Sequence, residues 1–395
     1  MKKIISLGLL GATSSLMALG GEFASLYKDP RIMGMGGANV AVGSYSTAVF
    51  SNPAGLANIK KEHGFVVDIL SVGVTASSGI QTISDDFANV EDGKNGQTET
   101  QQIVDILEEY NGDQFNVQSN NYTSVSKNSD LFAWSIGLLA ATDAGFAVHG
   151  NGSASGSLVE AAGRGYGGVV LGAAKTYDIE YGELDIGIGL KYITQTSYEG
   201  PLSVTDLTGD NPGETLQEEY EKEASGYGID VGITYKPLPD SSWHPALGLS
   251  VLNIGAMDME SNYGGQPLTV NIGASVSPEV KYIDKLVLAA DYVDMFNANT
   301  VRFYSFGDDG SVSHTDLVDS DFMKRLRLGA GIGLIDSTYF STTLNVGLYQ
   351  GAYTAGVDME LTILKLNVAT YQEEAGTGSV SIPDRRYMAQ IGIGW

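Results

Sequence analysis

The 395 residues carry 47 acidic side chains against 22 basic ones, for a formal charge of −25, together with 51 glycines and no cysteine. Such a charge argues against a nucleic-acid partner, which needs a basic surface, and the missing cysteine removes disulfides and cysteine metal sites. Beyond the N-terminus no run of about 18 apolar residues occurs, which argues against a transmembrane helix.

Residues 1–20 have the pattern of a secretory signal peptide. Lys2 and Lys3 precede an interrupted apolar stretch that ends at the small-x-small sequence Ala18-Leu19-Gly20. A basic start, a short apolar core and a small-residue site are typical of a segment that is cleaved on export. An uncleaved membrane anchor would need a longer unbroken run. We therefore expect an exported protein.

Residues 21–62 are predicted to form a compact N-terminal hatch. The sequence MGMGGANVAV at 33–42 lacks the third glycine of a dinucleotide loop and is not followed by a Gly-Lys-Ser/Thr triplet. Its glycines are therefore expected to allow close backbone packing. Asn52 and Pro53 are typical of a helix N-cap and a first-turn proline, which predicts a short helix over 52–58.

Apolar residues then alternate with polar residues or glycine, which is the signature of β-strands. Segments of about 9 to 14 residues suit membrane-crossing strands better than the shorter strands of a soluble sandwich. Fourteen segments are predicted: 63–75, 130–141, 145–156, 165–178, 183–197, 224–236, 243–256, 268–280, 285–297, 322–335, 339–349, 352–361, 364–374 and 385–395.

The connections between these segments alternate in length. Tight turns are predicted at 142–144, 179–182, 237–242, 282–284, 336–338 and 362–363. The other connections are mostly long: 76–129, 157–164, 198–223, 257–267, 298–321 and 375–384, with 350–351 as the short exception. Short periplasmic turns and long outer loops are typical of outer-membrane barrels. The fold class predicted is all-β, an antiparallel transmembrane barrel over 63–395, with 76–129 as a long acidic outer loop of helical content.

A barrel of this size leaves a hole, because about eight strands already fill their interior with side chains. We therefore expect the hatch to fold into the lumen. Charged residues on the polar phase of the strands should also face inward, since Arg or Lys facing lipid at mid-membrane costs about 2–4 kcal/mol. They indicate either a ligand path or paired charges that fasten the hatch: Asp185, Lys191, Asp230, Lys236, Asp291, Arg325, Arg327, Asp358 and Glu360.

The last strand alternates up to the terminal aromatic residue. Tyr387, Ile391, Ile393 and Trp395 share one face. This pattern resembles the signal by which the barrel-assembly machinery selects outer-membrane proteins, so we expect that machinery as a partner during biogenesis.

The hatch sequence resembles the N-terminal hatch motif of the FadL-like outer-membrane superfamily. The chain is also similar, in its order of elements, to barrel proteins labelled conjugal transfer TraF, whose Asp-rich helical insertion looks like 83–87 and 99–110. The resemblance implies a fourteen-stranded barrel with a plugged lumen, in a superfamily whose characterised transporters carry hydrophobic compounds. The matching residues are Arg31, Met33, Gly34, Gly36, Gly37, Asn52, Pro53, Ala54 and Gly55.

Catalytic motifs were not found. The four histidines form no His-Glu-x-x-His motif, and no Gly-x-Ser-x-Gly elbow occurs. Asp85-Asp86 and Asp308-Asp309-Gly310 lack the spacing of a calcium loop, which leaves weak divalent binding at outer loops as an alternative. No enzyme activity, cofactor or metal is predicted.

Two classes of function remain. The first is a Gram-negative outer-membrane barrel that passes hydrophobic small molecules, with outer-membrane lipids and a hydrophobic ligand as partners. The alternative is an outer-membrane component of conjugation, or of a related secretion or assembly machine, that transports nothing. An apolar pocket beneath the outer loops and a lateral gap in the wall would favour the first.

Overall fold

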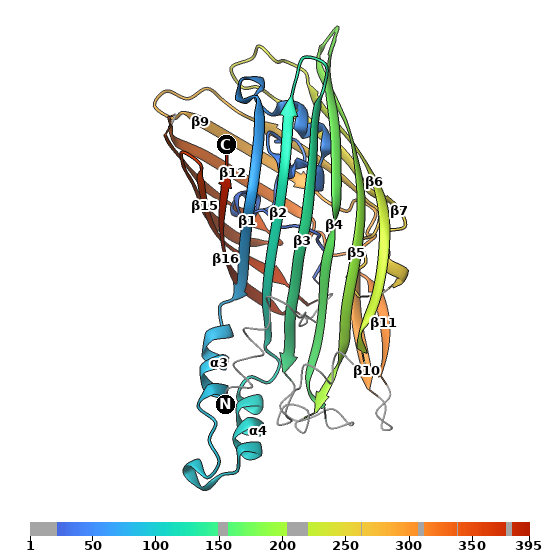
Figure 1. The fold of residues 1–395 in the computed structure, drawn as a ribbon, viewed down its shortest axis with the longest axis vertical. Helices are drawn as coiled ribbons and strands as arrows, with labels where there is room; N and C mark the ends of the chain where they lie inside the picture. The colour runs from blue at the N-terminus through green and yellow to red at the C-terminus, as the bar shows by residue number, and fades with distance from the viewer. Residues whose placement is uncertain are drawn as a thin grey trace.

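The computed structural model describes residues 22–148, 157–203, 220–261, 263–306, 312–337, 339–376 and 381–395. Within these ranges, fourteen strands close into one antiparallel barrel (Figure 1), which confirms the predicted fold class. The barrel strands are β1 (Phe65–Ser77), β2 (Gln114–Asn128), β3 (Ala133–Val148), β4 (Ser157–Ile179), β5 (Gly182–Ser203), β6 (Lys222–Lys236), β7 (Ala246–Gly255), β8 (Thr269–Val276), β9 (Lys285–Tyr292), β12 (Leu326–Asp336), β13 (Phe340–Tyr349), β14 (Ala352–Leu361), β15 (Leu364–Glu374) and β16 (Pro383–Gly394).

The barrel closes where its first and last strands meet, with Val74 of β1 opposite Ala389 of β16. Between β9 and β12 the chain leaves the wall and forms a separate hairpin, β10 (Thr300–Phe306) and β11 (Val312–Val318). Strand β9 therefore pairs directly with β12, and Asp291 lies opposite Arg327. The outer loop predicted at 298–321 thus contains two strands.

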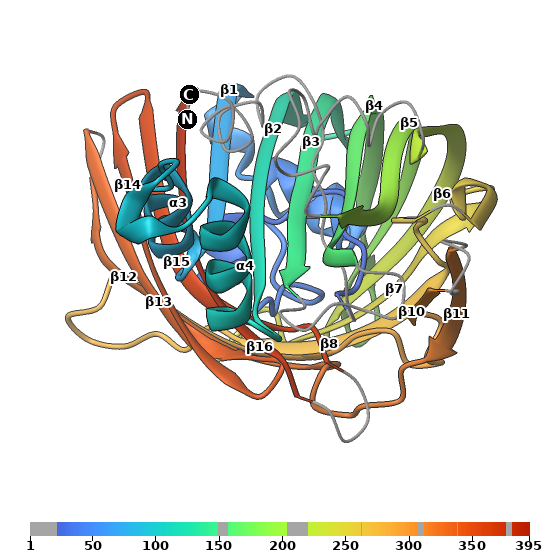
Figure 2. The same ribbon diagram turned by 90° about the horizontal axis from the view of Figure 1, so that it is seen from below.

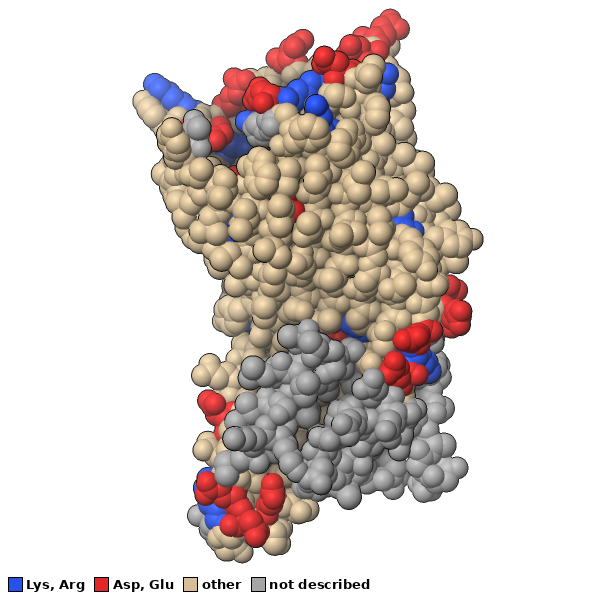
Figure 3. Space-filling view, in the orientation of Figure 1, with Lys and Arg blue, Asp and Glu red and all other residues tan. Residues whose placement is uncertain are grey.

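Side chains alternate between the two faces of the wall, as the two-residue period of a strand requires. On β5, Ile186, Ile188 and Leu190 are exposed on the outside, whereas Asp185 and Lys191 are buried inside. Figure 3 shows the result on one face of the barrel, where the middle is nearly free of charge and charged side chains gather toward the ends. Such an apolar belt suits the hydrocarbon core of a bilayer.

Two errors in the strand assignment changed which barrel strands were recognised, and a third is the outer loop predicted at 157–164, which belongs to β4. Strand β2 lies within the segment 76–129, which was predicted to be an outer loop. Its outward side chains include Ser119, Asn121 and Thr123, and its inward ones are polar as well, so no apolar face reveals the strand. Ser119 instead bonds sideways to Thr142 of β3, with 2.8 Å between their hydroxyl oxygens.

The second error is the turn predicted at 142–144, which divided β3 into two strands. Asp143 lies within the strand and faces inward, where Arg164 of β4 donates a hydrogen bond to it. A polar residue that is satisfied across the sheet does not interrupt a strand. Because one strand was missed and another was split, the predicted count of fourteen was still reached. Residues 149–156 lie outside the described residues, as does the predicted signal peptide.

The hatch lies inside the barrel, at the end where the short turns gather (Figures 1 and 2). It contains one short α-helix, α2 (Pro30–Gly34), and the 3₁₀ turns η2 (Ser46–Phe50), η3 (Pro53–Asn58) and η4 (Lys61–His63). Asn52 caps η3 by accepting the amide of Ala54, and Pro53 follows as its first residue. The short helix predicted at 52–58 is therefore a 3₁₀ helix.

A helical arm follows β1 and projects from the opposite end of the barrel (Figure 1). It consists of α3 (Ile80–Ala88), η5 (Lys94–Gly96) and α4 (Glu99–Glu109). A further short 3₁₀ turn, η6 (Met259–Ser261), is not part of the arm and lies between β7 and β8. Ile83, Ile103 and Leu107 are buried in one apolar cluster with Phe115 of β2 and other wall residues. The helical content predicted after the first strand is confirmed. Among the described residues, no helix has the length and apolar character needed to cross a membrane.

Candidate functional site in the barrel lumen

The hatch glycines lie against the wall without room for side chains. A β-carbon on Gly34 would come within 3.0 Å of the Cα of Gly356, and one on Gly36 would collide with the carbonyl oxygen of Leu328. Gly36 and Gly37 also have positive φ angles of 65° and 78°, which strain any other residue. These positions therefore serve close packing, as the lack of a phosphate-loop pattern predicted.

Wall side chains complete the hydrogen bonding of the hatch backbone. Asp291 of β9 accepts the amides of Asn39 and Val40 at 2.5 and 2.8 Å. Thr354 of β14 accepts the amide of Gly36 at 3.0 Å. Because buried backbone groups are costly when unpaired, these contacts define where the hatch must sit.

The Asn52 amide links the second half of the hatch to β6. Its nitrogen donates to the carbonyl oxygens of Val40 (2.7 Å) and Ile233 (3.1 Å). The next hatch residues, Pro53, Ala54 and Gly55, are all buried. This element therefore joins two parts of the hatch to each other and to the wall.

Two other residues of the hatch motif have packing roles. Arg31 forms an ion pair with Asp29 at 2.6 Å, and its guanidinium lies 4.4 Å from the ring centre of Tyr45. Met33 is buried in a small cluster with Tyr349, Ala369, Tyr371 and Met388 of the wall.

The lumen charges on β5 and β6 are paired with one another. Lys191 lies 2.8 Å from the Asp230 carboxylate and donates to Asn253 at 2.7 Å. Lys236 lies 2.9 Å from Asp185. Each of these two lysines is therefore neutralised by a carboxylate on the neighbouring strand.

Arg325 is fully buried and bonds to the outer connection, and its guanidinium also lies 5.1 Å from the ring centre of Phe23 in the hatch. It donates to the carboxylate of Asp294 at 2.8 Å and to the carbonyl oxygens of Asp294 and Asp321 at 3.0 and 3.1 Å. Arg327 donates to the carbonyl oxygen of Lys324 at 2.7 Å, and its guanidinium stacks 3.9 Å from the ring centre of Tyr349. Arg325 therefore bonds to the outer connection, whereas Arg327, two residues later, packs against Tyr349 of the wall.

Asp358 and Glu360 on β14 differ in their contacts and in their exposure to solvent. Asp358 accepts a hydrogen bond from Asn345 at 2.6 Å, whereas Glu360 is exposed near the end of its strand, opposite Lys365 in the sheet. Lys365 itself pairs with Asp68 at 2.6 Å. Most of the predicted lumen charges are thus bonded to one another or to the hatch.

A second charged cluster was not predicted, and Glu22 at the start of the described hatch is its centre. The Glu22 carboxylate contacts Lys28 at 2.6 Å and Arg386 of β16 at 2.9 Å, with Arg164 of β4 at 3.9 Å. Lys28 also pairs with Glu373 at 2.8 Å. Burial opposes ionisation of Glu22, but Arg386, Lys28 and Arg164 outweigh burial and hold its pKa well below the usual range.

The strand phase contains the signal for part of this cluster. Arg386 lies on the same inward face as Met388 and Gln390, so its orientation could have been predicted. The inward orientation of Arg164 was not predicted, because 157–164 was expected to be a loop and therefore had no strand phase. Glu22 carries no local signal for its place in the barrel, because its two arginine partners lie on strands that are distant in sequence, and only Lys28 is nearby in the chain.

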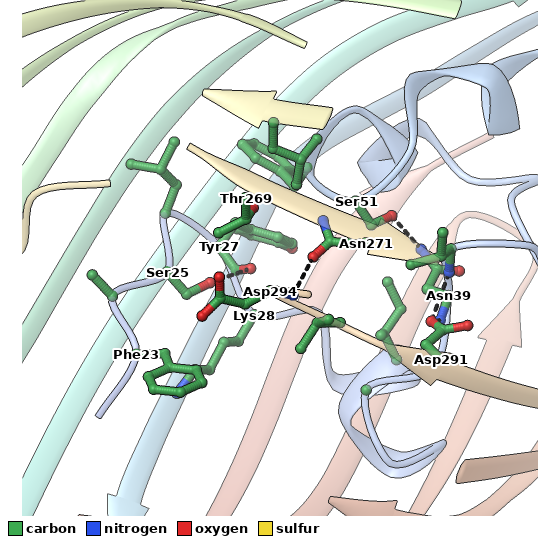
Figure 4. A pocket seen from close by; sticks show the side chains of 18 of the residues that line it. Phe23, Ser25, Tyr27, Lys28, Asn39, Ser51, Thr269, Asn271, Asp291 and Asp294 are labelled. Atoms are coloured by element: carbon green, nitrogen blue, oxygen red, sulfur yellow. Dashed lines mark hydrogen bonds between the residues drawn. The ribbon is translucent and has the colours of Figure 1, made fainter. Parts of the chain in front are cut away.

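A cavity of about 230 Å³ lies between the hatch and the wall (Figure 4). Its apolar lining includes Phe23 and Leu26 from the hatch and Leu252 and Val293 from the wall. Figure 4 shows polar side chains around it, among them Asn271 and Asp294, whose contact to each other is made through the backbone of Asp294. The cavity is therefore amphipathic, and it adjoins the outer ends of β8 and β9.

The residues predicted as an assembly signal face outward from β16. Tyr387, Ile391, Ile393 and Trp395 are all exposed on the barrel surface. The backbone amide and carbonyl of Trp395 pair with Val67 of β1. Every strand of the described barrel is hydrogen-bonded to both of its neighbours, including β1 to β16. The described part of the wall therefore shows no lateral gap between strands.

Metal chemistry has no visible basis in the described part of the chain, where no group of three or more His, Asp or Glu side chains could hold an ion. Asp85 and Asp86 lie on α3 of the arm. The sequence 308–310, the other candidate for divalent binding, lies outside the described residues.

A sequence model of the family described as "F plasmid transfer operon, TraF, protein" matches residues 49–342, more than half of the chain. No curated protein matches. This family match confirms the predicted likeness to barrel proteins labelled TraF.

Solved structures described as hydrocarbon transporters or channels match over nearly the whole chain. The Pseudomonas putida toluene transporter TodX is 11% identical, covers 96% of this chain and 99% of its own, and gives a TM-score of 0.51. A deltaS2 mutant of TodX, a monoaromatic hydrocarbon channel, is 11% identical over 95% and 99% of the two chains, with a TM-score of 0.54. A Pseudomonas aeruginosa FadL homologue is 10% identical over 94% and 98%, with a TM-score of 0.46. At these identities the likeness to the two TodX structures shows the fold alone.

Proposed function

The chain belongs to the TraF family of the F plasmid transfer operon, and from its fold we propose that it passes hydrophobic small molecules across the outer membrane. The observation that carries the proposal is the cavity between hatch and wall, lined by Phe23, Leu26, Leu252 and Val293. An amphipathic cavity with apolar side chains from both hatch and wall, held inside a plugged barrel, can provide a binding step on a transport path.

The volume of the cavity limits the size of the substrate that it can hold. Its volume of about 230 Å³ is below the roughly 300–1,000 Å³ of sites for drug-sized ligands. A compact molecule therefore fits better than a long chain. The structural neighbours support this class, because TodX is described as a toluene transporter and a monoaromatic hydrocarbon channel.

The proposal includes the location of the protein. The apolar belt and the alternating connections support insertion into the Gram-negative outer membrane, after export with a cleaved signal peptide and insertion by the barrel-assembly machinery. Outer-membrane lipids would then surround the belt. Channels rather than enzymes are the structural neighbours cited, which is consistent with a chain that binds and passes its substrate unchanged.

The test uses one strand with two faces. Leu252 of β7 lines the cavity, whereas Leu249 on the same strand is exposed outside. Cells that make the protein should take up labelled toluene faster than cells without it. Leu252→Trp should abolish the increase by filling the cavity, and Leu249→Trp should retain it at equal outer-membrane yield. Equal uptake by both variants and the wild type would exclude this cavity as the path.

The alternative is a component of conjugation that transports nothing, and the family description favours it. Its test is the mating efficiency of donor cells that lack the protein. Loss of mating that Leu252→Trp fully restores, with no toluene uptake by the wild type, would favour this second function.

A further inference from the structure

The barrel wall is much lower on one side than on the other. Strands β4 and β5 have 23 and 22 residues, whereas β8 and β9 have only 8 each. A strand that crosses a bilayer needs about 9–11 residues. On the low side, therefore, the sheet alone leaves part of the outer leaflet without an apolar wall.

Exposed apolar side chains gather in the connection that follows the low side, between β9 and β12. We call them the low-wall patch, and they are Phe296, Val318, Phe322 and Met323. Phe296 is 75% exposed, Val318 63% and Phe322 57%. Clustered apolar exposure of this kind marks a surface that meets a partner or a membrane.

The orientation of Phe322 is defined by its neighbours. Tyr292 is on the outward phase of β9, in step with the exposed Leu288, and the Phe322 ring lies 5.3 Å from the Tyr292 ring centre. Phe322 therefore lies on the outside of the wall, where it continues the apolar belt.

A set of hydrogen bonds around the buried Arg325 holds Phe322 in this position. Arg325 donates to the carbonyl oxygen of Asp321, while the Asp321 carboxylate accepts the amide of Met323 at 2.8 Å. The amides of Arg325 and Leu326 both bond to the Phe322 carbonyl. The turn is thus tied on its inner side, and its two apolar side chains are presented outward.

We propose that the low-wall patch is a lipid-docking surface that packs against acyl chains of the outer leaflet, in place of the strand length that β8 and β9 lack. Its continuity with the belt, through Tyr292, identifies the occupant as lipid. On the high side, the outward residues beyond Tyr192 of β5 include Thr194 and Thr196, which suit water or lipid headgroups instead.

The chain has no cysteine, so single cysteines can be labelled without background. The test compares Phe322→Cys and Val318→Cys, each carrying an environment-sensitive fluorophore, in vesicles of phosphatidylcholine with brominated acyl chains. Ile188→Cys in the middle of the belt is the lipid control, and Thr196→Cys is the aqueous control. We expect both patch positions to lose most of their emission to brominated lipid and little to aqueous iodide, as Ile188→Cys does.

The opposite result at the patch, quenching by iodide and not by brominated lipid, would overturn the proposal. Protection from both quenchers would also overturn it, because another protein surface, such as a second copy, would then cover the patch. If Ile188→Cys itself escapes brominated lipid, the barrel is not embedded, and the proposed outer-membrane location fails as well. The three results are therefore distinguishable.

Discussion

Gly36 and Gly37 have two separate reasons to be glycine, positive φ and contact with the wall. We predict that replacing both with Val loosens the hatch and raises single-channel conductance in planar bilayers, because β-branched side chains add volume to a closed contact. Gly64→Val is the control that separates backbone strain from collision with the wall. Gly64 also has a positive φ, 67°, but nothing lies within 4 Å of the position of a β-carbon, so this variant adds strain without a collision. Wild-type conductance in the double variant would argue against a tight hatch.

Glu22 is the residue through which we expect the seating of the hatch to depend on pH. Its pKa is lowered in the folded protein because Arg386, Lys28 and Arg164 outweigh its burial. A lowered carboxyl pKa gives stability that is fully present above the unfolded value and is lost as the pH falls toward the folded value. We predict that acidification below about 4.5 raises conductance, and that Glu22→Gln raises it at pH 7 and flattens this acid response. An unchanged acid response in Glu22→Gln would assign the effect to other carboxyls.

Among the secondary-structure elements, β16 has two roles: it pairs with β1 to close the barrel, and it carries the predicted assembly signal. Trp395 and Trp243 are equally exposed, at 58% each, so their replacement by Asp should cost similar folded stability. We predict that Trp395→Asp lowers outer-membrane yield well below that of Trp243→Asp, because the predicted assembly signal includes Trp395 and not Trp243. Immunoblots of membrane fractions provide the measurement, and equal yields would show that Trp395 is not part of the signal.

For the whole molecule, the wall and the hatch should be separable. The barrel closes through its own strand pairs, including β1 with β16, and needs no hatch residue for that closure. We predict that deleting 30–58 leaves a β-rich protein in the outer-membrane fraction that shifts on gels when boiled, and that its conductance exceeds that of the Gly36 and Gly37 double variant. A soluble product without a gel shift would contradict a self-sufficient barrel.

The fold class was predictable because its signal is local. The two-residue alternation on β5, β6 and β12 reflects lipid on one side and the lumen on the other, and this pattern is written along each strand. The cap at Asn52 and the close-packing glycines are local signals too. The same rule failed at β2, where both faces are polar, and at Asp143, where an inward carboxylate was mistaken for a turn.

The sequence by itself therefore determined the barrel, the phase of its inward charges and the presence of a compact N-terminal segment. Only the tertiary structure decided what those charges meet. Glu22 and Arg386 are 364 positions apart, yet they share a hydrogen bond. The cavity, the hydrogen bonds around Arg325 and the low-wall patch likewise depend on which strands become neighbours and how far each extends. Such pairings are set when the sheet closes on itself, and no period along the chain records them.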